Sequence, residues 1–75
     1  MSTKFNIGAA VRSLREQKRL TQFDLATAAG FSDPSGVGRI ERGTGYSEVL
    51  ERLDATAGAL GVTLEVLIGK ARVAS

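Results

Sequence analysis

The side chains in this chain that could do chemistry are hydrogen-bonding ones, and they fall in two short neighbouring segments. Thr21 and Gln22 lie in the first segment, and Ser35, Arg39 and Arg42 lie in the second. An arginine guanidinium can bond O6 and N7 of guanine together, which discriminates between bases by roughly 1–3 kcal/mol. Serine and glutamine side chains bond phosphates and base edges. The chemistry that these residues indicate is recognition of a polar partner.

The residue types that carry catalysis and metal binding are missing or badly spaced. The chain has no cysteine and no histidine, which removes disulfides, thiol catalysis and most zinc sites. Its clustered carboxylates, Glu48, Glu51 and Asp54, fall on the solvated face of an expected helix, an arrangement unsuited to general acid–base chemistry. We therefore expect no enzyme activity, no cofactor and no metal ion.

Length and charge restrict the class of protein further. The 75 residues predict one domain with a small core, and the net charge of +2 is mildly basic. Basic residues crowd the segment from Arg12 to Arg19, which suits a nucleic-acid site or an ordinary solvated helix face. No apolar run approaches the roughly 20 residues that span a membrane, and no signal peptide is evident. We expect a cytoplasmic protein with no membrane partner.

Apolar residues recur at helical spacing in five segments, which must position the polar residues. The expected helices cover about 6–18, 22–29, 34–42 and 48–60, followed by a short helix, LEVLIG, that ends at Gly69. Residues 62–68, VTLEVLI, could also be interpreted as a strand. We expect an N-terminal arm at 1–5, a domain at 6–69 and a C-terminal tail at 70–75.

The expected helix ends follow known capping preferences. Asn6, Thr21, Ser47 and Thr63 are candidate N-caps, and Thr21 with Asp24 makes a weak capping box. Asp33 is the expected cap of the helix at 34–42, with Pro34 in its first position, where a missing N–H costs nothing. The expected apolar stripes are the following: Ile7, Ala10, Val11, Leu14; Leu25, Ala26, Ala29; Val37, Ile40; Val49, Leu50, Leu53, Ala57, Leu60.

The two short helices at 22–29 and 34–42 form a helix-turn-helix pattern. LTQFDLATAAGFS and VGRIERG resemble the lambda-repressor/Cro-like (Xre) family, and the likeness extends over roughly residues 6–69. It implies a compact, all-α, five-helix domain that binds double-stranded DNA as a transcription regulator. It further implies a repressor that acts as a homodimer on a palindromic operator. The alternative is an antitoxin or anti-activator, a module that reuses the fold to bind a protein partner.

The resemblance also implies which residues contact DNA. Its docking geometry places the second helix of the motif in the major groove and the first across the backbone. The implied contact residues are Thr21 and Gln22 at a phosphate, Asp33, Pro34, Ser35, Gly36 and Arg39 near base edges, and Arg42 and Thr44 at the far phosphate strand. The chain is one residue longer than the usual pattern near Asp33, which shifts the register of the turn.

Several residues invite more than one interpretation. Gly36 and Gly38 cost about 1 kcal/mol each in a helix interior. Either they face outward and are tolerated there, or they let the backbone approach DNA. Phe23 is either partly buried or a partner contact.

Two further expectations come from the resemblance. Arg15 and Glu41 occupy positions that form an ion pair in this fold, and Arg19 replaces the glycine that relatives often carry at a left-handed cap. Val66, Ile68 and Val73 either form a dimer face or cover the monomer core.

Overall fold

Five α-helices make up the part of the chain that the computed structural model describes, residues 6–44 and 46–73. They are α1 (Ile7–Gln17), α2 (Gln22–Ala28), α3 (Gly36–Glu41), α4 (Tyr46–Ala59) and α5 (Leu64–Val73). The expected all-α, five-helix fold is confirmed, and the strand interpretation of residues 62–68 is wrong. Within the described ranges no helix is both long and apolar enough to span a membrane.

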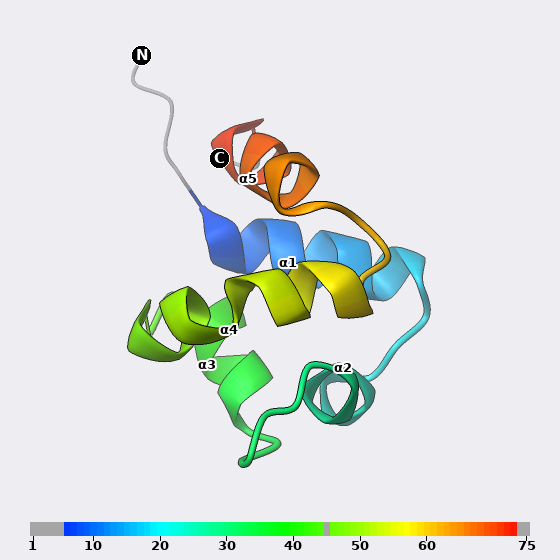
Figure 1. The fold of residues 1–75 in the computed structure, drawn as a ribbon, viewed down its shortest axis with the longest axis vertical. Coiled ribbons are helices and arrows are strands. Elements are labelled where there is room, and N and C mark those ends of the chain that lie inside the picture. The colour runs from blue at the N-terminus through cyan, green and yellow to red at the C-terminus, as the bar shows by residue number, and fades with distance from the viewer. Residues whose placement is uncertain (1–5, 45, 74–75) are drawn as a thin grey trace.

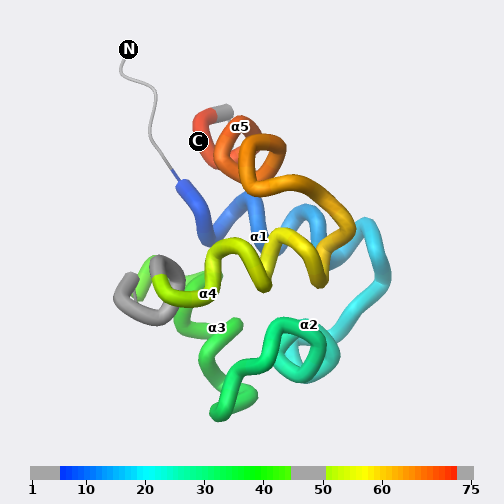
Figure 2. Tube along the Cα trace, viewed as in Figure 1, coloured from blue at the N-terminus to red at the C-terminus, as the bar shows by residue number. Residues whose placement is uncertain are grey.

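Helix α1 lies at the centre of the arrangement (Figure 1). It packs against α5 on one side and α3 on the other, while α4 packs against α2, α3 and α5. The chain path in Figure 2 places the α2–α3 turn at the end of the molecule opposite α5. The largest fully buried side chains are Leu25, Ile40, Leu60, Leu67, Val11 and Val37. These residues come from all four expected stripes and from α5, so one core serves every helix.

Side-chain caps begin three of the helices as expected. Asn6 Oδ1 accepts from the Ala9 backbone N–H at 3.0 Å. Thr21 Oγ1 accepts from Asp24 N at 2.9 Å, and Asp24 Oδ2 accepts from Thr21 N at 3.1 Å, so the capping box is complete. Thr63 Oγ1 accepts from Val66 N at 3.2 Å. Each contact satisfies backbone donors that a helix start leaves unpaired.

The first four helices end in the same way. A residue with a left-handed φ follows the last turn, and the next N–H donates back five residues to a carbonyl. The left-handed residues are Arg19 (φ 57°), Gly30 (77°), Gly43 (84°) and Gly61 (75°). Arg19 is therefore the single non-glycine residue in this conformation among the described residues. The expected left-handed cap at Arg19 is confirmed.

The start of α3 differs from the sequence-based expectation. The helix begins at Gly36, so Pro34 and Ser35 belong to the preceding turn and the expected span of 34–42 is wrong at both ends. The Asp33 carbonyl accepts from Gly36 N at 3.0 Å, and Asp33 Oδ1 accepts from Ser35 N at 3.0 Å. Asp33 thus caps this turn instead of the helix.

Two other boundaries also differ. Helix α4 begins at Tyr46, so Ser47 lies inside it and is not its cap; Arg52 interrupts the helix with φ −122° and ψ 21°. Helix α5 continues past Gly69 to Val73, because Ala71 is fully buried and its carbonyl accepts from Asn6 N at 2.9 Å.

The arm at 1–5 and residues 74–75 lie outside the described residues, as do the side chains of 46–50 and 73. The expectations for Tyr46, Glu48, Val49, Leu50 and Val73 fall there.

Candidate nucleic-acid interface

A buried carboxylate joins the three helices that carry the candidate site. Glu41, at the end of α3, accepts from Arg15 Nε at 2.6 Å and from Arg15 Nη2 at 3.2 Å. Arg15 also donates to the Leu20 carbonyl at 2.8 Å. The side chains of Arg15 and Glu41 are 13% and 5% exposed, so the expected partly buried ion pair is confirmed. Arg15 is consequently committed to the fold.

The same carboxylate orients Gln22, the first residue of α2. Glu41 Oε1 accepts from Gln22 Nε2 at 3.1 Å. A carboxylate can only accept, so this contact fixes which end of the Gln22 amide is the nitrogen. The amide nitrogen has two N–H donors, and Glu41 takes one of them. Gln22 as a residue is exposed, so its amide can take part in contacts with a partner.

Gly38 is the point where the start of α2 meets the end of α3. A Cβ at Gly38 would lie 3.1 Å from Arg42 Nη1 and 3.4 Å from Gln22 Oε1. The absence of a side chain therefore lets Gln22 and Arg42 come together over the helix backbone. Gly36 and Gly38 are both buried, so the expectation that they present a bare outer surface is wrong. The space beside Gly38 is filled by the protein's own polar side chains.

Arg39 belongs to a second cluster at the other end of α3. Its Nη1 donates to Ser35 Oγ at 2.8 Å and lies 3.4 Å from Asp33 Oδ2. Asp33 and Ser35 are exposed, and the Arg39 side chain is 32% exposed. The structure therefore brings three of the expected contact residues into one group on the turn before α3.

The turn lowers the pKa of Asp33. The Ser35 backbone N–H is the largest cause, followed by the Ser35 hydroxyl and the Arg39 guanidinium. The pKa of Asp24 is lowered mainly by the Thr21 backbone N–H. The hydrogen bond with Glu41 raises the pKa of Arg15, so this side chain stays charged at every relevant pH. Both aspartates are thus held as anions at the edges of the candidate interface.

The other expected contact residues occupy varied positions. Thr21 and Pro34 are exposed, whereas Gly36 is buried and offers no side chain. Arg42 is exposed and follows α3 as its C-cap. Thr44 Oγ1 donates to the Arg39 carbonyl at 3.1 Å, which makes Thr44 a cap of α3 whose oxygen can still accept.

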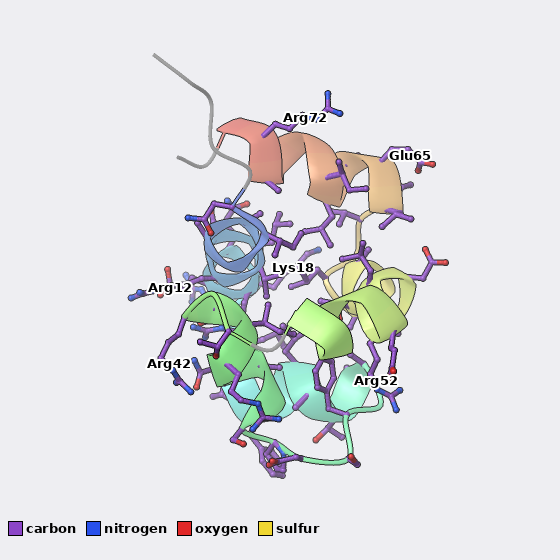
Figure 3. The ribbon with its side chains drawn as sticks, turned by 90° about the vertical axis from the view of Figure 1, so that its left-hand side faces the viewer. Arg12, Lys18, Arg42, Arg52, Glu65 and Arg72 are labelled. Carbon is purple, nitrogen blue, oxygen red and sulfur yellow. The ribbon has the colours of Figure 1, made fainter. Side chains whose placement is uncertain are left out.

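Positive side chains are present on more than one side of the molecule. In Figure 3, Arg12 and Arg42 project from the same side, one from α1 and one from the end of α3. Arg52 projects from the other side, and Arg72 lies on α5 at the far end. Arg12 forms an ion pair with Glu16 at 3.2 Å, and both side chains are more than half exposed. This pair belongs to an ordinary solvated face of α1. Arg42, beside Gln22, is the better candidate for a phosphate contact.

Sequence reasoning missed two residues that shape this region. A Cβ at Gly8 would clash with the Ile40 carbonyl oxygen and lie 3.0 Å from the Glu41 carbonyl oxygen, so Gly8 lets α1 approach α3 closely. A glycine inside a helical pattern is the signal that could have identified it. Arg52 lies with its guanidinium carbon 5.9 Å from the centre of the Phe31 ring and so braces the α2–α3 turn. Nothing in the sequence pattern indicates that contact.

The aromatic residues of the motif behave differently from each other. Phe31 is partly buried and packs against the core, as expected. Phe23 is 62% exposed, so the expectation of its partial burial is wrong. It lies beside Gln22 in the first turn of α2.

Comparison with known proteins agrees with this geometry. A family model described as a helix-turn-helix domain matches residues 6–67. The chain belongs to this helix-turn-helix family, of the lambda-repressor/Cro-like (Xre) kind that the sequence motifs indicated.

One relative is a phage protein. The chain is 36% identical over 64 residues to the immunity repressor protein of Bacillus phage phi105, which covers 85% of this chain and 43% of that protein. The chain thus spans less than half the length of this relative. No solved structure gives a significant match.

Proposed function

We propose that this protein binds double-stranded DNA selectively through α2 and α3 and acts as a transcriptional repressor. The observation that carries the proposal is the meeting of Gln22 and Arg42 over Gly38, with Arg39 inside α3 and Arg42 at the C-cap of that helix. Two phosphate-binding donors and one base-reading donor are thereby presented from adjacent helix ends. Similarity to a phage immunity repressor supports the assignment to repression.

Gln22 and Arg42 supply the contacts to the phosphate backbone in this proposal. Glu41 holds the Gln22 amide nitrogen, whose second N–H points to a phosphate oxygen. Arg42 adds a charged donor beside it. Such contacts position a protein on DNA without reading its sequence. Thr21, Pro34 and Thr44 are at the rim of this surface, and we leave out Gly36 because it is buried.

Arg39 supplies the base-specific contact. Its side chain reaches back to Ser35, just before α3, and the family's docking geometry places the N-terminal end of this helix at base edges in the major groove. A guanidinium prefers the O6 and N7 acceptors of guanine. We therefore assign the protein's guanine preference to Arg39.

We also propose that two copies bind a palindrome with half-sites about 34 Å apart. Helix α5 supports this assignment because Val66 is 44% exposed there, at the end of the molecule opposite the α2–α3 turn (Figure 1). Ile68 is partly buried beside it. Two copies read one palindrome only when both α2–α3 surfaces face the same side of the duplex, so the α5 helices would have to meet side by side.

Salt-dependent binding to duplex DNA, with two alanine variants, tests the proposal. Binding is measured on a pool of duplexes with a randomised centre, followed by titration of the enriched sequences. Replacing Arg42 with alanine should weaken all sequences alike and reduce the salt slope by about 1. Replacing Arg39 with alanine should relax base preference by about 1–3 kcal/mol. The proposal would be contradicted if no duplex sequence were enriched from the pool and neither alanine variant changed the affinity for DNA.

The alternative function is a module that binds a protein partner. Phe23 favours it, because a phenylalanine that is 62% exposed in the first turn of α2 would suit a protein contact. The same experiment separates the two functions. A partner-binding module shows no steep loss of DNA affinity with added salt.

A further inference from the structure

We propose that Asp33 and Ser35 hold the Arg39 guanidinium against base edges and away from phosphates, so that these two residues enforce the protein's preference for guanine. This inference rests on the proposed function and deepens it. Asp33 acts here as a positioning residue, because it works through Arg39 and makes no base contact of its own.

Hydrogen bonds connect each of the three residues to the other two. The Asp33 carboxylate is fixed by the Ser35 backbone N–H at 3.0 Å. Arg39 Nη1 is then held between Ser35 Oγ at 2.8 Å and Asp33 Oδ2 at 3.4 Å. The turn orients the carboxylate, and the carboxylate and hydroxyl together orient the guanidinium.

The exposure of these side chains argues against a purely structural role. Asp33 is 57% exposed, and ion pairs at that exposure contribute little to stability. Arg39 is only 32% exposed, whereas Arg12, in the solvated Arg12–Glu16 pair, is 65% exposed. Arg39 is therefore more restrained than the solvated Arg12, and its contacts with Ser35 and Asp33 are part of that restraint.

Electrostatics explain how this restraint would affect DNA binding. Phosphate contacts carry no sequence information, and a long arginine side chain can reach a phosphate as easily as a base. A carboxylate beside the guanidinium repels an approaching phosphate. The restraint also reduces the conformational freedom that the side chain loses on binding. Asp33 should thus lower the affinity for unrelated DNA while it raises the preference for guanine.

Asp33→Asn is the decisive variant, because asparagine can still accept from Ser35 N but carries no charge. Asp24→Asn is its matched control: Asp24 is also an exposed carboxylate that accepts from a backbone N–H, at 3.1 Å from Thr21 N, and it has no arginine contact. Both variants remove one negative charge from the helix-turn-helix motif. Thermal melting shows whether each variant is folded.

The readouts are the sequences enriched from a randomised duplex pool and the affinity for an unrelated duplex. Both variants should bind the unrelated duplex more tightly than the wild type, by a similar factor. At the base position that depends on Arg39, the ratio of affinities for guanine over other bases should fall about tenfold in Asp33→Asn. The same ratio should be unchanged in Asp24→Asn. Ser35→Ala should lose part of the same preference.

The Arg39→Ala background completes the test. In a protein that already carries Arg39→Ala, Asp33→Asn should cause no further change in base preference, because the guanidinium that Asp33 holds is absent. A further loss would mean that Asp33 acts through the conformation of the turn, and it would overturn the inference. Undiminished guanine preference in Asp33→Asn would overturn it as well. If the wild type enriches no sequence at all, the proposed function fails and the inference with it. If the wild type selects a sequence and Asp33→Asn keeps the same guanine preference, the inference is rejected but the proposed function stands.

Discussion

The Glu41 carboxylate accepts two hydrogen bonds from the Arg15 guanidinium, at 2.6 and 3.2 Å, and so ties the end of α3 to α1. The third hydrogen bond to this carboxylate comes from Gln22, which belongs to α2. A single nearly buried anion therefore sets the relative positions of the two helices of the motif and of the helix behind them. Four predictions on stability and one on DNA binding follow from contacts of this kind.

Replacing Glu41 with alanine should lower the free energy of unfolding by about 3 kcal/mol, because it leaves the Arg15 charge buried without its partner. Glu16→Ala removes the acid of the exposed Arg12–Glu16 pair and serves as the control. That substitution should cost less than about 1 kcal/mol. Urea denaturation of the two variants measures the difference, and similar losses would contradict a special role for Glu41.

Replacing Arg19 with glycine should stabilise the protein by about 1 kcal/mol. Arg19 has φ 57° at the end of α1, where a side chain is strained and glycine is not. Gln17→Gly, two residues earlier and in helical conformation, should destabilise by about 1 kcal/mol. Opposite shifts of the melting temperature are the expected result; a loss in both variants would show that the Arg19 cap is not strained.

Replacing Gly8 with alanine should destabilise the protein by about 1–3 kcal/mol. Its Cβ would meet backbone carbonyl oxygens of Ile40 and Glu41, which cannot move without separating α1 from α3. Gly58→Ala is the control, since nothing lies within 4 Å of a Cβ there. That variant should gain up to about 1 kcal/mol from helix propensity. Equal effects in denaturant titrations would contradict close packing at Gly8.

Replacing Gly38 with alanine should leave stability nearly unchanged but weaken DNA binding to all sequences by about fivefold. The new Cβ would press on Arg42 Nη1 at 3.1 Å and Gln22 Oε1 at 3.4 Å, the mobile ends of two side chains. Both can shift without disturbing the core, but they then leave their phosphate-binding positions. Titration of an enriched and an unrelated duplex measures the effect. A change in base preference with unchanged overall affinity would argue against this role.

Stability should fall as the pH drops below the ordinary aspartate pKa of 3.8. The pKa values of Asp24 and Asp33 are lowered in the folded state, so protons bind more tightly to the unfolded chain. Their stabilising effect is complete above the unfolded-state value and disappears as the pH falls through the folded-state values. Melting temperatures measured across this range should fall less steeply in the Asp24→Asn, Asp33→Asn double variant. An identical pH profile in wild type and double variant would contradict the assignment.

Helix identity and motif were accessible from the sequence because they depend on local spacing and capping. The apolar periodicity of α1 and α2 and the Thr21–Asp24 capping box are set by neighbours within a few residues, whereas the left-handed cap at Arg19 was expected from the family resemblance. The Arg15–Glu41 pair came from resemblance to a known fold, which supplies the long-range geometry that one sequence lacks.

The tertiary structure determined where helices approach closely and where the last helix ends, which local sequence signals do not specify. The sequence pattern did not single out Gly8 and showed Gly38 only as an unfavourable helix position. The approach of α1 to α3, and of Gln22 to Arg42, explains why neither position carries a side chain. Helix α5 passes through Gly69 because Ala71 finds a place in the core, which outweighs the local tendency of glycine to end a helix. Contacts between residues distant in the chain depend on how helices pack, and packing free energy is larger than the local preferences that a sequence pattern displays.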